Sequence, residues 1–372
     1  MYLQKLKLIN FKNYEEAALQ FSDKINCFVG DNGAGKTNIL DALYYLSFCK
    51  SYFNSVDSQN IRHGEDFFAI HGIYKNEESL NDQVSVVQKK NKKKSVKFNK
   101  KEYTRLADHI GKIPLVMVSP YDRDLINEGS EVRRKYIDGV ISQFDPVYLD
   151  HLLNYNKSLM QRNALLRSFA ENRYFDKVSL EIWDEKLVTY GKPVFEKRKA
   201  FLEEFNPLFE NYYRILSGGH EEVEIVYQSR LLEQDLRNLL ENSVEKDTAL
   251  RYTSVGIHKD DLLFKINGYP VKKFGSQGQQ KTFVIAVKLA QFEYMRLVKK
   301  FKPVLLFDDI FDKLDHKRVN QIIELVSEDN FGQVFITDTQ PERIEAIFER
   351  VNIDHKVFHV ENGQVLERNP DQ

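Results

Sequence analysis

The stretch FVGDNGAGKTNIL, residues 28–40, decides the fold of this chain. Its residues 30–37, GDNGAGKT, match the pattern G-x-x-x-x-G-K-[ST], whose glycines let backbone N–H groups turn towards phosphate oxygens. The loop follows a strand-like apolar run and precedes residues 36–48, whose apolar side chains are spaced as in a helix. This context predicts a phosphate loop, in which Lys36 reaches the β- and γ-phosphates and the Thr37 hydroxyl binds Mg²⁺. The residues that we expect to bind the nucleotide are Gly30, Asp31, Asn32, Gly33, Ala34, Gly35, Lys36 and Thr37.

An acidic strand end far along the chain supplies the carboxylates that such a loop needs. The segment PVLLFDDIFDKLD (303–315) is apolar up to Phe307 and then carries Asp308 and Asp309. We assign Asp308 to Mg²⁺, directly or through water, and Asp309 to polarising the attacking water. The alternative is a strand that ends in a solvated acidic turn.

A second glycine-containing loop, FGSQGQQKT (274–282), opens a helix just before the acidic strand. A helix start with small residues and free amides suits anions. One ATP does not need two such loops from a single chain. We therefore expect two chains, arranged head to tail, to share each ATP between the phosphate loop of one and the Ser-Gly turn of the other. The alternative is an ordinary helix cap at Ser276.

The rest of the chain reads as an α/β protein interrupted by a helical insert. Strand-like runs dominate up to Pro120, and helical spacing without sustained heptads follows up to about residue 250. Strands and helices then alternate again to the end. We predict three segments: residues 1–120 form the N-terminal part of a head, residues 121–250 a helical arm, and residues 251–372 the C-terminal part of the head.

The bulk composition narrows the class of protein. Apolar residues make up 42% of the 372 residues, charged residues 29%, and the net charge is −1, so any contact with nucleic acid must come from local patches. Cys27 and Cys49 form no paired framework, which indicates a reducing environment. Neither a signal peptide nor a run of about 18 apolar residues is present, so we expect a cytoplasmic protein without a membrane span.

One local patch is the lysine run QKKNKKKSVKFNKK (88–101), which carries eight lysines between two strand-like pieces. On a hairpin, such a run forms a positive tip that binds phosphates without reading sequence. The alternative is a solvated turn. The DNA-binding candidates are Lys92, Lys93, Lys94 and Lys97. A second basic candidate is the group Arg133, Arg134 and Lys135.

Taken in order, these motifs resemble those of the ABC-type ATPases: a Walker A loop, an S-x-G-Q-type signature, a Walker B strand, and a D-loop that ends at Asp315. More narrowly, the whole chain resembles the RecF family of bacterial recombination and gap-repair ATPases. The matching pieces run in order over essentially the full length: INFKNY (9–14), GDNGAGKTNILDAL (30–43), SPYDRDLINEGSEVRRKYID (119–138), YNKSLMQRNALL (155–166), GIHKDDLLFKING (256–268), SQGQQKT (276–282) and LLFDDIFDKLD (305–315).

The resemblance implies an ABC-type head with a mixed sheet and helices, like that of SMC proteins and Rad50, plus an inserted helical arm without a long coiled coil. It also implies ATP with Mg²⁺ as cofactors and an ATP-dependent homodimer that grips single-stranded, gapped or duplex-junction DNA. Such proteins hydrolyse ATP slowly and work with RecR and RecO to place RecA at gaps, which links them to replication and the SOS response.

Residue by residue, the resemblance extends the site. The signature, which meets the γ-phosphate of the partner subunit together with Asp315, is Ser276, Gln277, Gly278, Gln279 and Gln280. Thr337 takes the place of the switch histidine of many ABC ATPases and joins Lys36 and Asp309 as a catalytic candidate, while Lys12 and Asn13 lie near the nucleotide. In GIHKDDL, Ile257 and Lys259 depart from the proline and arginine usual in the family.

Several other functions remain open on the sequence. A transporter or translation-type ABC ATPase predicts a switch histidine and an uninterrupted head, and the chain has neither. A non-enzymatic DNA scaffold with a structural ATP does not account for the pair Asp308 and Asp309. A kinase needs an acceptor pocket, for which the sequence shows no motif. Another ATPase of the SMC or Rad50 type remains the nearest alternative.

Overall fold

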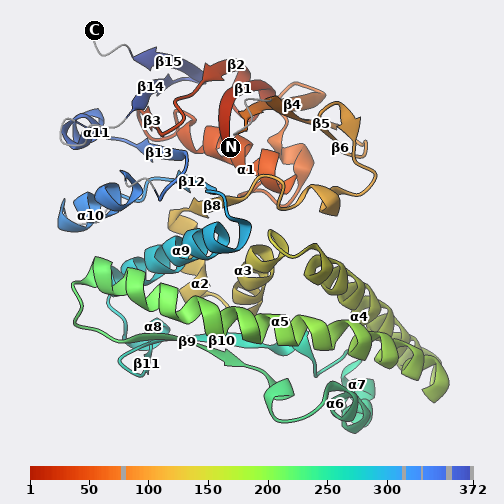
Figure 1. The fold of residues 1–372 in the computed structure, drawn as a ribbon. Coiled ribbons are helices and arrows are strands. Elements are labelled where there is room, and N and C mark those ends of the chain that lie inside the picture. Colours follow the sequence, from red (N-terminus) through yellow and green to blue (C-terminus); the bar gives the residue numbers. More distant parts are fainter. Residues whose placement is uncertain (77–80, 312–315, 328–329, 349–353, 369–372) are drawn as a thin grey trace. The chain divides into compact units, whose positions relative to one another are not determined.

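The computed structural model describes residues 1–76, 81–311, 316–327, 330–348 and 354–368 (Figure 1). The chain forms two compact units. The first consists of Met1–Asp122 and Val287–Gln372, and the second of Arg123–Ala286. This division differs from the predicted one, which assigned residues 251–286 to the head. They join the second unit because the strand Asp261–Ile266 (β10) pairs along its whole length with Val223–Gln228 (β9).

Two six-stranded sheets build the first unit (Figure 1). One sheet is antiparallel and has the order β2-β1-β4-β5-β6-β7. Its strands are Tyr2–Phe11 (β1), Tyr14–Gln20 (β2), Phe67–Lys75 (β4), Asn81–Lys89 (β5), Ser95–Phe98 (β6) and Lys101–Glu102 (β7). The other sheet has the order β15-β14-β3-β13-β12-β8 and is parallel apart from β15. Its strands are Ile25–Val29 (β3), Leu115–Val118 (β8), Val304–Phe307 (β12), Val334–Asp338 (β13), His355–Glu361 (β14) and Gln364–Arg368 (β15).

The order of the parallel sheet positions the candidate site. Strand β13 lies between β3 and β12, and all three run in the same direction. The carboxyl ends of parallel neighbours meet at one edge of the sheet, which is where α/β proteins bind ligands. The phosphate loop after β3 and the acidic pair after β12 therefore come to the same edge, although 272 positions separate Lys36 from Asp308 (308 − 36).

The helix after the phosphate loop, Lys36–Phe48 (α1), contacts strands of both sheets. Its side chains Ile39, Leu40, Leu43 and Leu46 are at most 1% exposed and belong to a core that joins both sheets. A helix buried on most sides needs apolar residues around its circumference, and α1 has them. The remaining helices of this unit are His316–Ser327 (α10), Pro341–Phe348 (α11) and the part of Gln277–Lys299 (α9) from Val287 onward.

Two long helices and a small sheet dominate the second unit (Figure 1). The helices Pro146–Asn172 (α4) and Lys177–Ser217 (α5) pack side by side, and α5 also packs on β9. Asp145 and Asp176 cap their N-termini by accepting backbone N–H groups, and α5 ends at Gly218, whose φ is 85°. The other elements are Asp124–Asn127 (α2), Ser130–Ser142 (α3), Leu236–Asn242 (α6), Val244–Leu250 (α7), Val271–Phe274 (α8), the start of α9 and Tyr269–Pro270 (β11).

The predicted α/β class with a helical insert and no long coiled coil is confirmed, while four strands were missed, of which β7 and β11 are only two residues long. The insert contains β9, whose partner β10 arrives only after the helices α6 and α7. The strand β15 also escaped the sequence pattern. Among the described helices, none combines the length and the apolar character that crossing a bilayer would require.

Candidate nucleotide-binding site

The phosphate loop is shaped by glycines that no other residue replaces without strain. Gly30 has a φ of 149°, and a Cβ there would lie 2.2 Å from the carbonyl oxygen of Val360 on β14. Gly35 has a φ of 121°, and a Cβ there would lie 2.4 Å from Nδ2 of Asn13. The motif therefore serves two purposes. It directs the backbone towards a ligand, and it lets neighbouring strands approach the loop closely.

The Lys36 side chain is folded back into the loop. Its ammonium donates to the carbonyl oxygens of Gly30, at 2.8 Å, and Asp31, at 2.9 Å. Only 3% of Lys36 is exposed. The cation is thus held within the curve of the phosphate loop, as the motif predicts for a lysine that contacts phosphate oxygens.

Asn13, predicted to lie near the nucleotide, braces the phosphate loop directly. Its Nδ2 donates to the carbonyl oxygen of Ala34 at 3.0 Å, and its Oδ1 accepts from Nδ2 of Asn38 at 2.7 Å. The next residue, Tyr14, donates its hydroxyl to the carbonyl oxygen of Gly35 at 3.0 Å. The turn between β1 and β2 therefore contacts both sides of the loop.

Lys12, the other residue predicted to lie near the nucleotide, is bound to α1. Its ammonium forms an ion pair with Oδ2 of Asp41 at 2.7 Å and lies 5.3 Å from the centre of the Phe53 ring. Asp41 is fully buried and also accepts the backbone N–H of Tyr52. Lys12 thus has an observed structural partner on the helix that follows the phosphate loop.

The acidic strand end meets the phosphate loop as predicted. Oδ1 of Asp308 accepts the hydroxyl of Thr37 at 2.8 Å and the hydroxyl of Thr337 at 3.0 Å. Burial raises the pKa of the Asp308 carboxyl to about 6, and the charge of Asp309 adds to this, while the hydrogen bonds from Thr37 and Thr337 and the charge of Lys36 act in the opposite direction. The structure therefore brings Lys36, Thr37, Asp308, Asp309 and Thr337 into one cluster.

Asp309 departs from the extended strand that precedes it. Its φ is 45°, in the left-handed region, and its backbone N–H donates to the hydroxyl of Thr337 at 2.9 Å. Non-glycine residues in this region are uncommon and gather at functional sites. The turn changes the direction of the chain between Asp308 and Asp309, so two adjacent carboxylates can serve different tasks.

The oxygen atoms around Asp308 suit Mg²⁺. Magnesium in phosphoryl-transfer sites is held by one or two protein oxygens and completed by phosphate oxygens and water. The Thr37 hydroxyl and the Asp308 carboxylate, 2.8 Å apart, are such a pair. Within the described residues, no group of three or more His, Cys, Asp or Glu side chains could hold a metal by itself.

The signature segment begins α9 in the second unit. Ser276 Oγ accepts the backbone N–H of Gln279 at 3.2 Å, and the Gln279 side chain accepts the backbone N–H of Ser276 at 2.7 Å. This reciprocal pair is a capping box. The alternative interpretation as a helix cap is thus confirmed as the local structure. The trans role of Ser276, Gln277, Gly278, Gln279 and Gln280 stays a prediction, and Ser276 and Gln277 are exposed. Asp315 lies outside the described residues.

One buried ion pair near the site was not predicted. Asp122, in the segment SPYDRDL, accepts the hydroxyl of Tyr52 at 2.6 Å and the ammonium of Lys288 at 2.7 Å. Both charged residues are at most 5% exposed. A sequence signal existed, because Lys288 interrupts the apolar run VIAVKLAQF of α9. Buried lysines usually have a carboxylate partner, and only the fold could identify Asp122.

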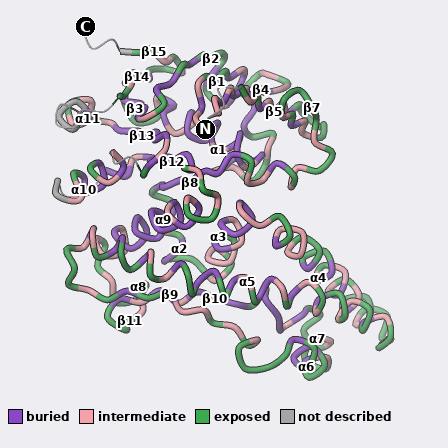
Figure 2. The backbone as a smooth tube through the Cα atoms, in the orientation of Figure 1, coloured by how far each residue is buried: buried purple, intermediate pink, exposed green. Residues whose placement is uncertain are grey.

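The lysine run forms the predicted hairpin, but its lysines differ in how far they are exposed to solvent. Lys92, Lys93 and Lys97 are exposed. Lys94 is a correction to the predicted DNA contacts, because its side chain is 9% exposed and pairs with Oδ2 of Asp57 at 2.6 Å. Its ammonium also contacts the hydroxyl of Tyr45 on α1 at 3.0 Å. Lys94 therefore anchors the hairpin instead of extending from it. The neighbouring strand β7 is coloured as exposed in Figure 2.

The second basic candidate is engaged within its own unit. Arg133 forms a bidentate pair with Asp261, and Arg134 donates to the carbonyl oxygen of Asp260 at 2.7 Å. Lys135 pairs with Glu131 one helical turn away. The two arginines thus tie α3 to β10 and the residue before it.

Comparison with known proteins agrees with this geometry. The model of the RecF/RecN/SMC N-terminal domain matches residues 2–365. The chain is 55% identical to the DNA replication and repair protein RecF of Flavobacterium johnsoniae over 361 residues, covering 97% of this chain and 100% of the relative. It is 48% identical to the protein of that name from Bacteroides thetaiotaomicron over 372 residues, covering all of both.

Solved structures of RecF and of an Smc head domain share the fold of this chain. The recombination mediator protein RecF-ATP of the RecFOR pathway superimposes with a TM-score of 0.90 at 30% identity, over 99% of this chain and 98% of that chain. The Smc head domain of Pyrococcus furiosus shares the fold, with a TM-score of 0.59 at 18% identity, over 100% of this chain and 97% of that chain. With its phosphate loop, acidic strand end and full-length similarity, the chain belongs to the RecF family, within the RecF/RecN/SMC group of ATPase heads.

Proposed function

We propose that this chain is an ATP-dependent DNA clamp of recombinational repair, in which ATP binding drives dimerisation and slow hydrolysis resets it. The observation that carries the proposal is the contact between Thr37 and Asp308, which joins the phosphate loop to the acidic strand end. A phosphate loop paired with a carboxylate of this kind is the common apparatus for handling a nucleoside triphosphate. Membership of the RecF family supplies the link to DNA repair.

The chain's own residues account for nucleotide binding. Backbone N–H groups of residues 30–37 and the N-terminus of α1 face the phosphates, and Lys36 adds a cation held in the loop. Thr37 and Asp308 would hold Mg²⁺, which, when bound, neutralises charge on the β- and γ-phosphates. Asn13 binds the loop through Ala34 and so holds it against the β1–β2 turn.

Hydrolysis depends on two residues at the end of the sheet. Asp309 orients and polarises the attacking water, and Thr337 holds the backbone of Asp309 through its hydroxyl. Thr337 also donates to Asp308, so a single hydroxyl contacts both the Asp308 carboxylate and the backbone of Asp309. A threonine does not titrate in the physiological range, so it positions groups without moving a proton, in keeping with slow turnover.

The second half of each site comes from a second copy of the chain. The exposed Ser276 and Gln277 at the start of α9 meet the γ-phosphate bound by the partner subunit, and Asp315 assists from the D-loop. Because residues 251–286 carry this signature, we assign them to the ATPase head by function, with residues 1–120 and 287–372, and residues 121–250 to the arm. ATP is then the link between two copies.

The exposed lysines of the hairpin support DNA as a partner, and membership of the RecF family supports the protein partners. The exposed lysines Lys92, Lys93 and Lys97 contact the DNA backbone without reading its sequence. A structural relative is a mediator of the RecFOR pathway, which supports RecR and RecO as partners in loading RecA at gaps and in SOS induction. Cys27 and Cys49 are buried free thiols, in keeping with a cytoplasmic setting.

Light scattering and DNA binding, each measured with and without ATP, test the clamp. We expect ATP to convert monomers of the wild-type chain into dimers that retain DNA. Lys36→Ala abolishes both effects, because it removes the cation at the phosphates. Ser276→Asp keeps an oxygen that caps the helix but places a charge against the γ-phosphate, so it binds ATP and stays monomeric.

Ser276→Asn is the matched control, because asparagine caps as well as aspartate does without adding charge. It should dimerise with ATP. If ATP drives neither dimerisation nor DNA retention in the wild type, the clamp is rejected, and a non-enzymatic scaffold takes its place.

A further inference from the structure

The first turns of α5 carry aliphatic side chains on the surface. Val178 is 69% exposed and Ile182 53%, whereas Leu180, between them, is 1% exposed. Val178 and Ile182 are four positions apart, so they lie on one face of the helix. The turn before α5 adds Tyr174, 64% exposed, and Phe175, 43% exposed. Clustered apolar side chains on a surface mark a site of interaction more often than scattered ones do.

Val178 and Ile182 border a groove between α5 and the helices α6 and α7, all within the second unit. Its volume is about 480 Å³. The apolar lining comes from Val178, Ile182 and Val188 of α5 and from Leu240 and Val244 on the facing side. The lining residues of α5 extend from residue 177 to residue 188, a length of about 17 Å at 1.5 Å per residue. That length accommodates about three turns of another helix.

The charged residues around the groove are predominantly acidic. Four carboxylates line it against two cations, a balance of −2 (2 − 4). The cation Arg237 pairs with Glu185, and Lys177 lies 3.6 Å from Glu181. The full set is Glu181, Asp184, Glu185, Glu241, Lys177 and Arg237. Asp184 also pairs with the buried cation Arg162, so the balance including that cation is −1 (3 − 4), and the excess negative charge is carried by Glu241. The rim therefore favours a cationic occupant over an anionic one.

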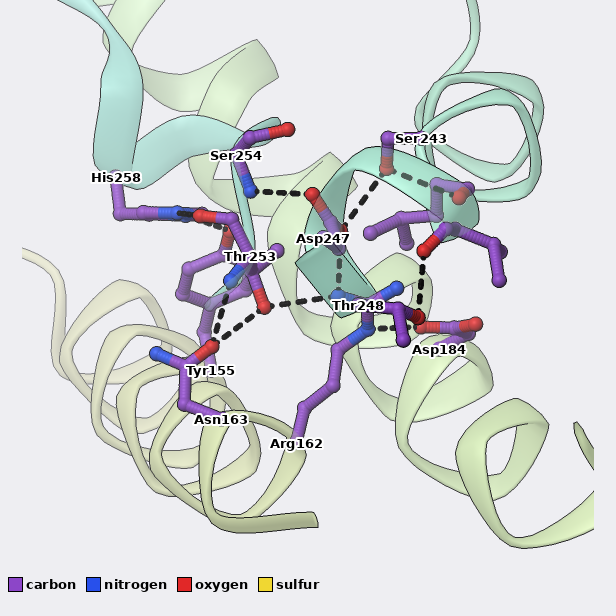
Figure 3. Close-up of polar contacts among 12 residues, drawn as sticks. Tyr155, Arg162, Asn163, Asp184, Ser243, Asp247, Thr248, Thr253, Ser254 and His258 are labelled. Atoms are coloured by element: carbon purple, nitrogen blue, oxygen red, sulfur yellow. Dashed lines mark hydrogen bonds and ion pairs between the residues drawn. The ribbon is translucent and has the colours of Figure 1, made fainter. Parts of the chain in front are cut away.

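A buried polar network beneath the groove holds its walls in place (Figure 3). Arg162 on α4 is fully buried and donates Nε to Asp184 of α5 at 2.5 Å. Its Nη1 donates to Asp247 of α7 at 2.6 Å and to the hydroxyl of Thr253 at 3.0 Å. One guanidinium thus connects both helical walls of the groove to α4. A groove with walls fixed in this way costs little to organise on binding.

We propose that this groove docks an amphipathic helix of a partner protein, with an apolar ridge that packs on Val178 and Ile182 and flanking lysines or arginines that face the acidic rim. The mode is the packing of an amphipathic helix into an apolar groove. The site lies apart from the nucleotide chemistry and needs no ATP. Its failure and the failure of the proposed clamp are therefore separate results.

The probe is a fluorescent 21-residue helical peptide with leucines along one face and lysines beside them, and its binding is followed by anisotropy. A second peptide replaces every lysine with glutamate. We expect the full-length chain to bind the cationic peptide and to discriminate against the anionic one. Ile182→Asn weakens binding at least tenfold, and Glu241→Gln weakens it less. Val147→Asn is the matched control, because Val147 is 63% exposed on α4 and does not line the groove.

Binding that persists unchanged in Ile182→Asn overturns the proposal, as does equal binding of both peptides or of neither. Binding of a fluorescent duplex oligonucleotide that Ile182→Asn weakens would assign the surface to nucleic acid and overturn the proposal. Val178→Asn repeats the measurement at a second exposed position, so the result does not depend on the folding of one variant. ATP should leave every one of these affinities unchanged.

Discussion

Asp309 combines an unusual backbone conformation with the catalytic role that we propose for it. Its left-handed φ of 45° would be costly in the middle of a strand, yet the hydroxyl of Thr337 holds its backbone N–H. Asp308, one position earlier, is 3% exposed and already engaged by two hydroxyls. These contacts agree with the proposed roles, in which Asp308 binds Mg²⁺ and Asp309 acts on the attacking water.

Replacing Asp309 with asparagine tests that assignment. We expect Asp309→Asn to lower the rate of ATP hydrolysis at least about a hundredfold, because an amide is not a base. ATP-dependent dimers should persist, since binding rests on Lys36 and Thr37. The measurements are phosphate release and light scattering. Asp23→Asn, at an exposed turn, is the control. Turnover at the wild-type rate would exclude Asp309 as the residue that activates water.

His258 is a second residue whose surroundings set its chemistry. One ring nitrogen contacts the hydroxyl of Tyr155 at 2.8 Å, and the other contacts the carbonyl oxygen of Thr253 at 3.0 Å. A carbonyl oxygen only accepts, so Nε2 carries the proton and Nδ1 accepts from Tyr155. Burial is the main cause that lowers the pKa of His258, the bond to Thr253 opposes it, and the charges of Lys259 and Arg134 act with burial, so that the resulting pKa is about 4.

This pKa predicts how stability depends on pH. In the unfolded chain the pKa of His258 is about 6.5, so between pH 6.5 and pH 4 the unfolded state binds a proton that the native state does not. Stability is therefore complete above about pH 6.5 and declines as the pH falls to 4, by up to about 3 kcal/mol. Urea unfolding across this range measures the slope. His258→Gln, which does not titrate, should lose this contribution, and equal slopes in both proteins would contradict the assignment.

At the scale of elements, the lysine hairpin is tied to the helix that follows the phosphate loop. Lys94 contacts Asp57 and the hydroxyl of Tyr45, and its ammonium lies 4.9 Å from the centre of the Tyr45 ring. His109, which follows the hairpin in the chain, contacts the carbonyl oxygen of Leu46 on the same helix through Nε2, and its ring centre lies 6.3 Å from the ring centre of Phe98 in the hairpin. A positively charged hairpin can thus remain ordered although most of its lysines face solvent.

Lys94→Met measures how much the contacts of Lys94 with Asp57 and Tyr45 contribute to the free energy of unfolding. The change keeps most of the side-chain volume but leaves the partly buried Asp57 without its cation, so we expect a loss of about 1–3 kcal/mol in the free energy of unfolding. Lys93→Met, one position earlier and exposed, should change stability by less than about 0.5 kcal/mol. Urea denaturation compares the two. Equal stabilities would show that the contact with Asp57 contributes nothing.

At the scale of the whole molecule, the motifs are divided between two compact units. The phosphate loop and the acidic strand end belong to the first unit, and the signature belongs to the second. The basic hairpin belongs to the first unit as well, and the net charge of the chain is only −1. The proposed DNA binding would therefore depend on a few lysines and respond strongly to salt.

Reversing the hairpin charge tests this dependence. We expect the triple change to glutamate at Lys92, Lys93 and Lys97 to weaken binding of the ATP-bound protein to DNA. The slope of log affinity against log salt should fall by about one for each lysine that contacts a phosphate. A filter-binding series from low to moderate salt measures both quantities. The control reverses three exposed lysines of the second unit, Lys157, Lys199 and Lys246, for the same change in net charge. Unchanged affinity at low salt would remove the hairpin from the DNA-binding surface.

The sequence by itself determined the phosphate loop, the acidic strand end and the α/β class with a helical insert, because each depends on local spacing of glycine, apolar and acidic residues. Only the tertiary structure decided which distant residues meet. The burial of Lys94 against Asp57, the pairing of Asp122 with Lys288, and the strand β9 all depend on partners at least 33 positions away (261 − 228). The buried Lys94 and its exposed neighbour Lys93 stand in the same local sequence pattern. Their difference in free energy comes from desolvation and from the partner's charge, which only the folded chain provides.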